Sequence, residues 1–403
     1  MNKLLHKTIQ KKGLWILVGL LALGQLGRVT LLPDIRLYPH DIFITLWCIS
    51  LLLTNREKVM SAVTDLSKKI LAFNFFIPVL LILSSAFLLA QLQQPALLPL
   101  LYLLRTLFYG IFVYLLATTT SLTKKDFEQA LISLGLISVV LGFLQLILIP
   151  DTRFLFILGF DDHYYRMIGT QLDPAFLGAL LLISAFVTWH STFLAKHSLV
   201  KTGCIVLFSL GILLTFSRAT YLGYALTALA LTAHSKKIRQ SILKNKLGSG
   251  LVTIGIITVV FMARSTGGEG TNLLRTATIT ARIASVKEHL PRTRKEWIIG
   301  KGLFYSTVQN TTSTSGILEV PNQAKVNNSL LFFILESSGI LGLAAWIYAL
   351  LKGMQVLVLQ GEKTLVYFIG ILLLLSCFNN TAFQPFVLLT SLLGFAAVVR
   401  EYR

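Results

Sequence analysis

Arginine residues recur in four short segments of this chain, and a guanidinium suits the binding of phosphate better than any other side chain. Its planar fork of N–H donors matches the oxygens of a phosphate or diphosphate. Arg166 lies in "HYYRMIGTQLDP", Arg218 in "LTFSRATY", Arg282 in "TARIASVKEHL" and Arg105 in the apolar "LLPLLYLLRTLFYG". If these segments meet at one face of the folded protein, they form a site for a ligand that carries phosphate. For Arg105, well inside an apolar segment, a structural ion pair is the open alternative.

Three other residues could take part in chemistry at such a site. Glu336 stands inside the apolar stretch "VNNSLLFFILESSGILGLAAW", which also contains Asn327, and His289 follows Arg282 in the same basic segment. A carboxylate or an imidazole can act as a general base, whereas an amide can only position a hydroxyl or donate to phosphate. A buried structural hydrogen bond for Glu336 and a solvated loop position for His289 remain the alternatives.

Other chemistry-bearing patterns are missing from the sequence. It has no Gly-rich phosphate loop, no zinc-binding His pair and no nucleophile elbow. The adjacent Asp161 and Asp162 could bind a divalent ion beside a diphosphate, or could simply be solvated. We therefore expect neither a metal nor a cofactor.

The elements that must position these residues are membrane helices. The chain has 403 residues, of which 55% are hydrophobic and 13% charged, against about a quarter charged in ordinary soluble domains. Segments apolar enough to cross a bilayer recur from end to end. We expect an all-α polytopic protein, a single integral membrane domain over residues 1–403, with about twelve transmembrane helices at 14–32, 40–54, 71–90, 96–119, 129–149, 172–189, 199–215, 219–233, 249–263, 329–351, 364–378 and 382–399.

The distribution of Lys and Arg predicts the orientation of these helices. Alternate loops are basic, beginning with "MNKLLHKTIQKK" and ending with the tail "REYR", which places both termini in the cytoplasm by the positive-inside rule. Residues 264–328 then form a large external loop between helices nine and ten, with short helices around "VKEHLPRTRKEWIIG". This loop is itself basic, which suits an anionic ligand. The high pI of about 9.9 comes mostly from the inner loops, so we expect no nucleic-acid partner.

Four blocks of sequence resemble one bacterial family. The segments "RMIGTQLDPAFLG", "LTFSRATYLGY", "ARIASVKEHL" with "WIIGKGLFYS", and "NNSLLFFILESSGILGLAAW" occur in the order and spacing seen in the O-antigen ligase and O-antigen polymerase superfamily. The resemblance covers roughly residues 160–350, and the earlier helices match in hydropathy alone. It implies an inner-membrane glycosyltransferase of cell-surface polysaccharide biosynthesis that is inverting and independent of metal.

The resemblance also implies a substrate and residue roles. An oligosaccharide would leave an undecaprenyl diphosphate carrier for a lipid or glycan acceptor, and other polysaccharide-assembly proteins could take part. Arg166, Arg218 and Arg282 match the family's diphosphate-binding arginines. Family members commonly have His-Asn where this chain has Asn327 and Asn328. This difference shifts the expectation towards a polymerase or another polysaccharide-assembly member, and it leaves a degenerate, non-catalytic homologue open. A flippase or exporter of lipid-linked glycans, and a non-catalytic assembly partner, remain the competing classes.

Overall fold

The computed structural model describes most of the helical part of the chain. The described residues are 2–32, 35–72, 97–158, 160–234, 271, 280, 283–284, 286–287, 290–291, 293–302, 329–379 and 381–399. Three of the predicted site residues, Arg282, His289 and Asn327, lie outside them. So do most of the helix predicted at 71–90 and all of the helix predicted at 249–263.

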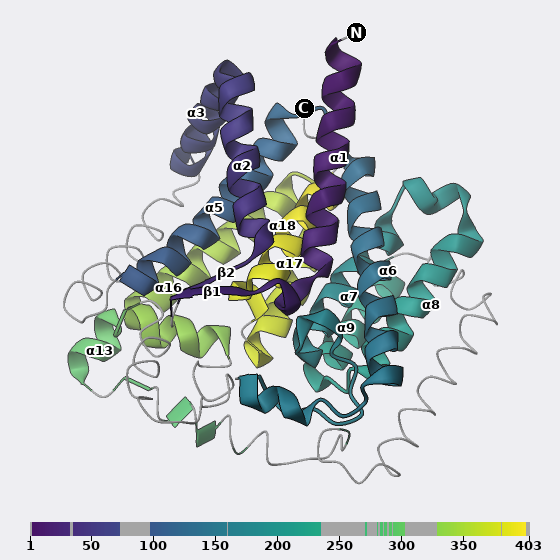
Figure 1. Cartoon of the computed structure of the whole chain (residues 1–403). Coiled ribbons are helices and arrows are strands. Elements are labelled where there is room, and N and C mark those ends of the chain that lie inside the picture. The colour runs from purple at the N-terminus through teal and green to yellow at the C-terminus, as the bar shows by residue number, and fades with distance from the viewer. Residues whose placement is uncertain are drawn as a thin grey trace.

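The predicted all-α class is confirmed for the described residues, apart from one small hairpin (Figure 1). The hairpin pairs β1 (Val29–Leu32) with β2 (Ile35–Leu37) in antiparallel register. The α-helices are α1 (Asn2–Ala22), α2 (Pro39–Thr54), α3 (Arg56–Ala72), α5 (Leu97–Thr119), α6 (Lys124–Leu148), α7 (Pro174–His190), α8 (Ser198–Leu214), α9 (Arg218–His234), α13 (Arg294–Ile299), α16 (Leu330–Leu359), α17 (Lys363–Phe378) and α18 (Pro385–Val398). Short 3₁₀ helices are η1 (Gly24–Gly27), η2 (Arg153–Leu158), η3 (Gly169–Gln171), η4 (Phe193–Lys196) and η5 (Thr381–Phe383).

Among the described helices, three are long and apolar enough to cross a membrane. These segments are Leu101–Thr119 of α5, all of α6 and all of α16. Five more apolar helices are shorter, namely α2, α7, α8, α17 and α18. These helices support association with a membrane, while the count of twelve crossings stays a prediction.

Local sequence explains where α7 begins. Asp173 caps α7, since its Oδ1 accepts hydrogen bonds from the backbone N–H groups of Ala175 at 2.7 Å and Phe176 at 2.9 Å. Pro174 follows at the first helical position, where its missing N–H costs nothing. The helix predicted at 172–189 therefore begins within two residues of its predicted start.

The core of the bundle forms around α7. Its side chains are buried along most of its length, and α6, α8 and α18 pack against it. Leu177, Leu180 and Leu181 have no exposed surface. In Figure 1 the N-terminal end of α1 and the C-terminal end of α18 both lie towards the top of the bundle, and α13 lies lower, at the left.

Two predicted helices differ clearly from the structure in their bounds or shape. The helix expected at 14–32 begins at Asn2 and ends at Ala22, because Gly24 adopts a left-handed φ of +55° and the chain then turns into the hairpin. The helix expected at 329–351 continues to Leu359 and is kinked at Gly339, whose φ and ψ are 65° and −168°. Hydropathy alone does not reveal either feature, since both depend on backbone geometry.

Candidate functional site

The segment that carries Arg166 is joined directly to the turn that carries Arg218. The Arg166 side chain is buried, at 7% exposed. Its Nε donates to the carbonyl oxygen of Thr215 at 3.1 Å and its Nη2 to that of Phe216 at 3.3 Å. The backbone N–H of Met167 also donates to the carbonyl oxygen of Leu214 at 2.9 Å. Arg166 therefore holds the end of α8 and the start of the turn in place.

The turn places Arg218 at the first position of α9. Phe216 takes a left-handed φ of +51°, an uncommon conformation for a residue with a side chain. Ser217 then caps the new helix, because its Oγ accepts from the backbone N–H of Thr220 at 3.4 Å and from the Thr220 hydroxyl at 2.9 Å. Arg218 is half-buried and stands at a helix N-terminus, where unpaired N–H groups and the helix dipole favour an anion.

A small polar cluster lies beside Arg166. Nδ1 of His163 is 3.4 Å from Nη1 of Arg166. Asp161, His163 and Asp173 each offer a ligand atom within 4.8 Å of the others. A divalent cation could be accommodated by such a set, although Asp173 also caps α7. The sequence singled out Asp161 with Asp162, and it gave no signal that His163 and Asp173 would join Asp161.

The loop that carries His163 is tied to the end of α6. The backbone N–H and the hydroxyl of Thr152 both donate to the His163 carbonyl oxygen at 2.9 Å. Asp151 and Arg153 form an exposed ion pair at 2.6 Å. Hydrogen bonds from the Arg153 side chain and backbone lower the pKa of the Asp151 carboxyl to about 2. The loop is therefore held in a defined conformation next to Arg166.

Glu336 lies where α13 meets the kink of α16. Its side chain is buried, at 3% exposed. The Gly339 kink interrupts the backbone hydrogen bonds of α16. Backbone N–H groups of the segment after α13 donate instead to the carbonyl oxygens before the kink. Lys301 N–H donates to the carbonyl oxygen of Glu336 at 2.7 Å and Gly302 N–H to that of Ser337 at 3.0 Å. Two of the blocks that carry the family resemblance, "WIIGKG" and "ESSG", are thus paired through their backbones.

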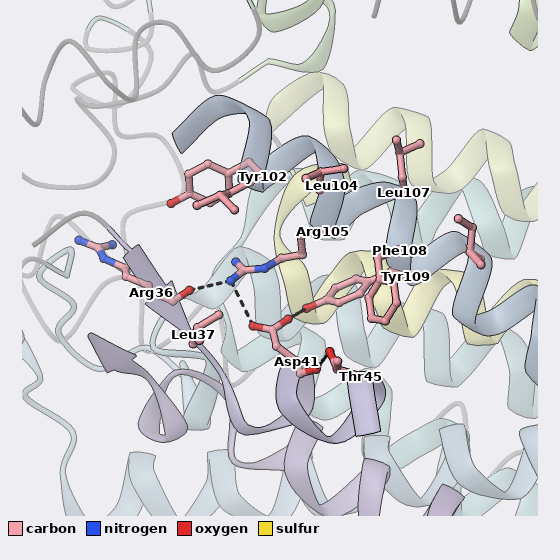
Figure 2. A pocket seen from close by; sticks show the side chains of 12 residues that line it. Arg36, Leu37, Asp41, Thr45, Tyr102, Leu104, Arg105, Leu107, Phe108 and Tyr109 are labelled. Carbon is pink, nitrogen blue, oxygen red and sulfur yellow. Dashed lines mark hydrogen bonds and ion pairs between the residues drawn. The ribbon is translucent and has the colours of Figure 1, made fainter. Parts of the chain in front are cut away.

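Arg105 contacts a different part of the molecule, between α5, α2 and the hairpin (Figure 2). Its Nη2 lies 3.1 Å from Asp41 Oδ2 and donates to the carbonyl oxygen of Arg36 at 2.7 Å. The hydroxyl of Tyr109 donates to Asp41 Oδ1 and is 2.9 Å from Nε2 of His40. The structural ion pair that the sequence left open for Arg105 is therefore present. The sequence analysis did not identify Asp41 as the partner, because Asp41 and Arg105 are far apart in the chain.

Comparison with known proteins adds no identification. No protein-family model matches the chain, and no curated protein matches it.

Proposed function

We propose that this protein is a membrane glycosyltransferase of the O-antigen ligase or polymerase type. It would transfer or polymerise oligosaccharide units from undecaprenyl diphosphate carriers at the outer face of the bacterial cytoplasmic membrane. The topology proposed with it has about twelve crossings and cytoplasmic termini. It is supported by the first turn of α1 and the last turn of α18, which both lie towards the end of the bundle away from α13 (Figure 1).

One observation carries this proposal. The buried Arg166 guanidinium donates to the two carbonyl oxygens that precede Ser217 and Arg218, so two arginines far apart in sequence belong to one local structure. Such rigid support is what a site needs if it is to hold charge that develops during a reaction. The two blocks of sequence that contain these arginines also carry the family resemblance.

The two arginines have different roles in this proposal. Arg166 is a positioning residue, since three of its nitrogens already face protein acceptors. Arg218, half-buried at the N-terminus of α9, is the residue that would contact the diphosphate. Arg282 would add a second contact from the loop, whereas the Asp41 ion pair of Arg105 favours a structural role for Arg105.

The chemistry is a single displacement. The oxygen of an acceptor hydroxyl attacks the anomeric carbon, the bond from that carbon to the diphosphate oxygen breaks, and the diphosphate leaves with the electron pair. Arg218 would stabilise the charge gained by this leaving group, an interaction that strengthens in the transition state. The hydroxyl proton would pass to Glu336 or His289, and Asn327 would position the acceptor.

A transfer assay tests the proposal. Purified protein is given an undecaprenyl-diphosphate oligosaccharide, and the products are separated by length. A ladder indicates a polymerase, and transfer only in the presence of lipid A core indicates a ligase. Arg218→Ala should lower the rate roughly 10²- to 10³-fold, the usual cost of removing one donor to a developing anion. Arg56→Ala removes an exposed arginine of α3, away from this loop, and should retain activity.

A flippase or exporter is the alternative, and one observation favours it. The buried network of His40, Tyr109, Asp41 and Arg105 places ionisable groups between helices, as transport paths do. Proteoliposomes with the same donor separate the two functions. Movement of unchanged donor across the bilayer would support transport and contradict the transferase, and an unchanged donor that stays in place would leave a non-catalytic partner.

A further inference from the structure

We infer that the pocket between α2, α5 and the hairpin binds an anionic membrane phospholipid, with its phosphodiester at Arg36 and one acyl chain along α5. The pocket has a volume of about 600 Å³. Arg36, Asp41 and Arg105 line it together with apolar side chains of α5, among them Leu101, Leu104 and Leu107. This site is separate from Arg166 and Arg218 and does not depend on the proposed transferase activity.

The lining is divided into a polar end and an apolar wall, as an amphiphile requires. Arg36, Arg105 and Asp41 lie at one end, near the hairpin, and the α5 side chains continue from there (Figure 2). Leu101, Leu104, Leu107 and Ile111 follow one another at spacings of three or four, so they form one stripe on the helix. These four side chains are more than a third exposed on a segment apolar enough to cross a membrane. A hydrocarbon chain is the natural neighbour of such a stripe.

The polar end combines the Arg105–Asp41 ion pair with a second arginine, Arg36. Arg105 is held between Asp41 and the carbonyl oxygen of Arg36. The Asp41 carboxylate also accepts from the Tyr38 backbone N–H at 3.0 Å and from the Tyr109 hydroxyl. In the part of the chain that the structure describes, the Arg36 guanidinium has no carboxylate partner, and its side chain extends away from the Arg105–Asp41 pair (Figure 2).

Charge decides which lipid fits. Two arginines and one aspartate give the described lining a formal charge of +1, which one phosphodiester neutralises. A diphosphate would bring at least one further negative charge close to Asp41, where like charges repel at low dielectric. A zwitterionic headgroup would place its own cation near Arg36. The observations therefore favour a phosphatidylglycerol-like lipid over the glycan carrier.

Lipid titration of the purified full-length protein in detergent tests this inference. Phosphatidylglycerol is added, and bound lipid is counted by native mass spectrometry. We expect saturable binding that is roughly tenfold tighter than that of phosphatidylcholine with the same chains, a difference equal to about 1.4 kcal/mol. Equal binding of the two lipids would overturn the inference. So would equal protection against thermal unfolding by inorganic phosphate, because the apolar wall would then have no role.

Variants localise the binding and avoid the Arg105–Asp41 pair. Arg36→Gln should weaken phosphatidylglycerol roughly tenfold, while Arg56→Gln, at an exposed arginine of α3, should not. Leu107→Trp should fill the pocket and abolish the tight binding, and Leu226→Trp is its control, since both leucines are 42% exposed. Unchanged binding in both pocket variants would overturn the site. Displacement of the lipid by stoichiometric undecaprenyl diphosphate would assign the pocket to the carrier instead.

Discussion

Gly300, at the end of α13, and Gly339, at the kink of α16, lie against each other's chains. A β-carbon on Gly300 would overlap the backbone of Ser337 and Ser338, and one on Gly339 would overlap the backbone of Ile298 and Ile299. Both glycines have positive φ, 81° and 65°. Glycine at both positions is what allows α13 to pack on α16 beside Glu336.

Gly339→Ala should therefore destabilise the protein. The new methyl group meets backbone that has little freedom to move, and the φ angle is strained for alanine. We expect a loss of about 2 kcal/mol or more in the free energy of unfolding, measured by denaturant unfolding in detergent. Gly370→Ala is the control, because no atom lies within 4 Å of a β-carbon there. If the two variants are equally stable, the docking of α13 on α16 is wrong.

Arg166→Lys should lower the free energy of unfolding of the protein. A lysine keeps the charge, but its single nitrogen cannot reproduce the donors that Arg166 directs at Thr215 and Phe216. Removing a buried hydrogen-bonded partner costs about 1–3 kcal/mol, so the variant should unfold at lower denaturant. Arg56→Lys, at an exposed arginine of α3, should change stability by less than about 0.5 kcal/mol, as surface substitutions usually do. The reverse order of stability would show that Arg166 does not support the turn.

Asp41→Asn should lower the free energy of unfolding by more than the loss of an ordinary surface ion pair does. The side chains of Arg105 and Asp41 are only 15% and 12% exposed, so neutralising Asp41 leaves a largely buried guanidinium without its counter-ion. We expect a loss of about 3 kcal/mol. Arg105→Met combined with Asp41→Asn should cost less than the sum of the single substitutions. Additive losses in this double-mutant cycle would mean that the pair contributes no coupling.

Glu336→Gln separates a general base from a structural carboxylate. If Glu336 accepts the acceptor proton, the substitution should lower the transfer rate about 10²- to 10⁴-fold and leave donor binding unchanged. His289→Gln, measured in the same assay, tests the other candidate. A loss of less than about tenfold for Glu336→Gln would exclude it as the base.

The sequence by itself determined the helical character of this protein and many of its helix starts. Long apolar segments and local capping signals such as Asp173–Pro174 depend on neighbours within a few residues, so α5, α6, α7 and α18 could be predicted with useful boundaries. The early end of α1 and the kink in α16 could not, because each depends on one glycine adopting a conformation that hydropathy does not report.

Only the tertiary structure decided which side chains meet. The sequence grouped Arg105 with Arg166 and Arg218, since all three were expected at one face of the membrane. In the folded protein Arg105 forms an ion pair with Asp41 on α2, and Arg166 donates a hydrogen bond to the turn before α9. The physical reason is that these contacts join segments far apart in the chain. Their partners are fixed by how the helices pack, which no local pattern of residues specifies.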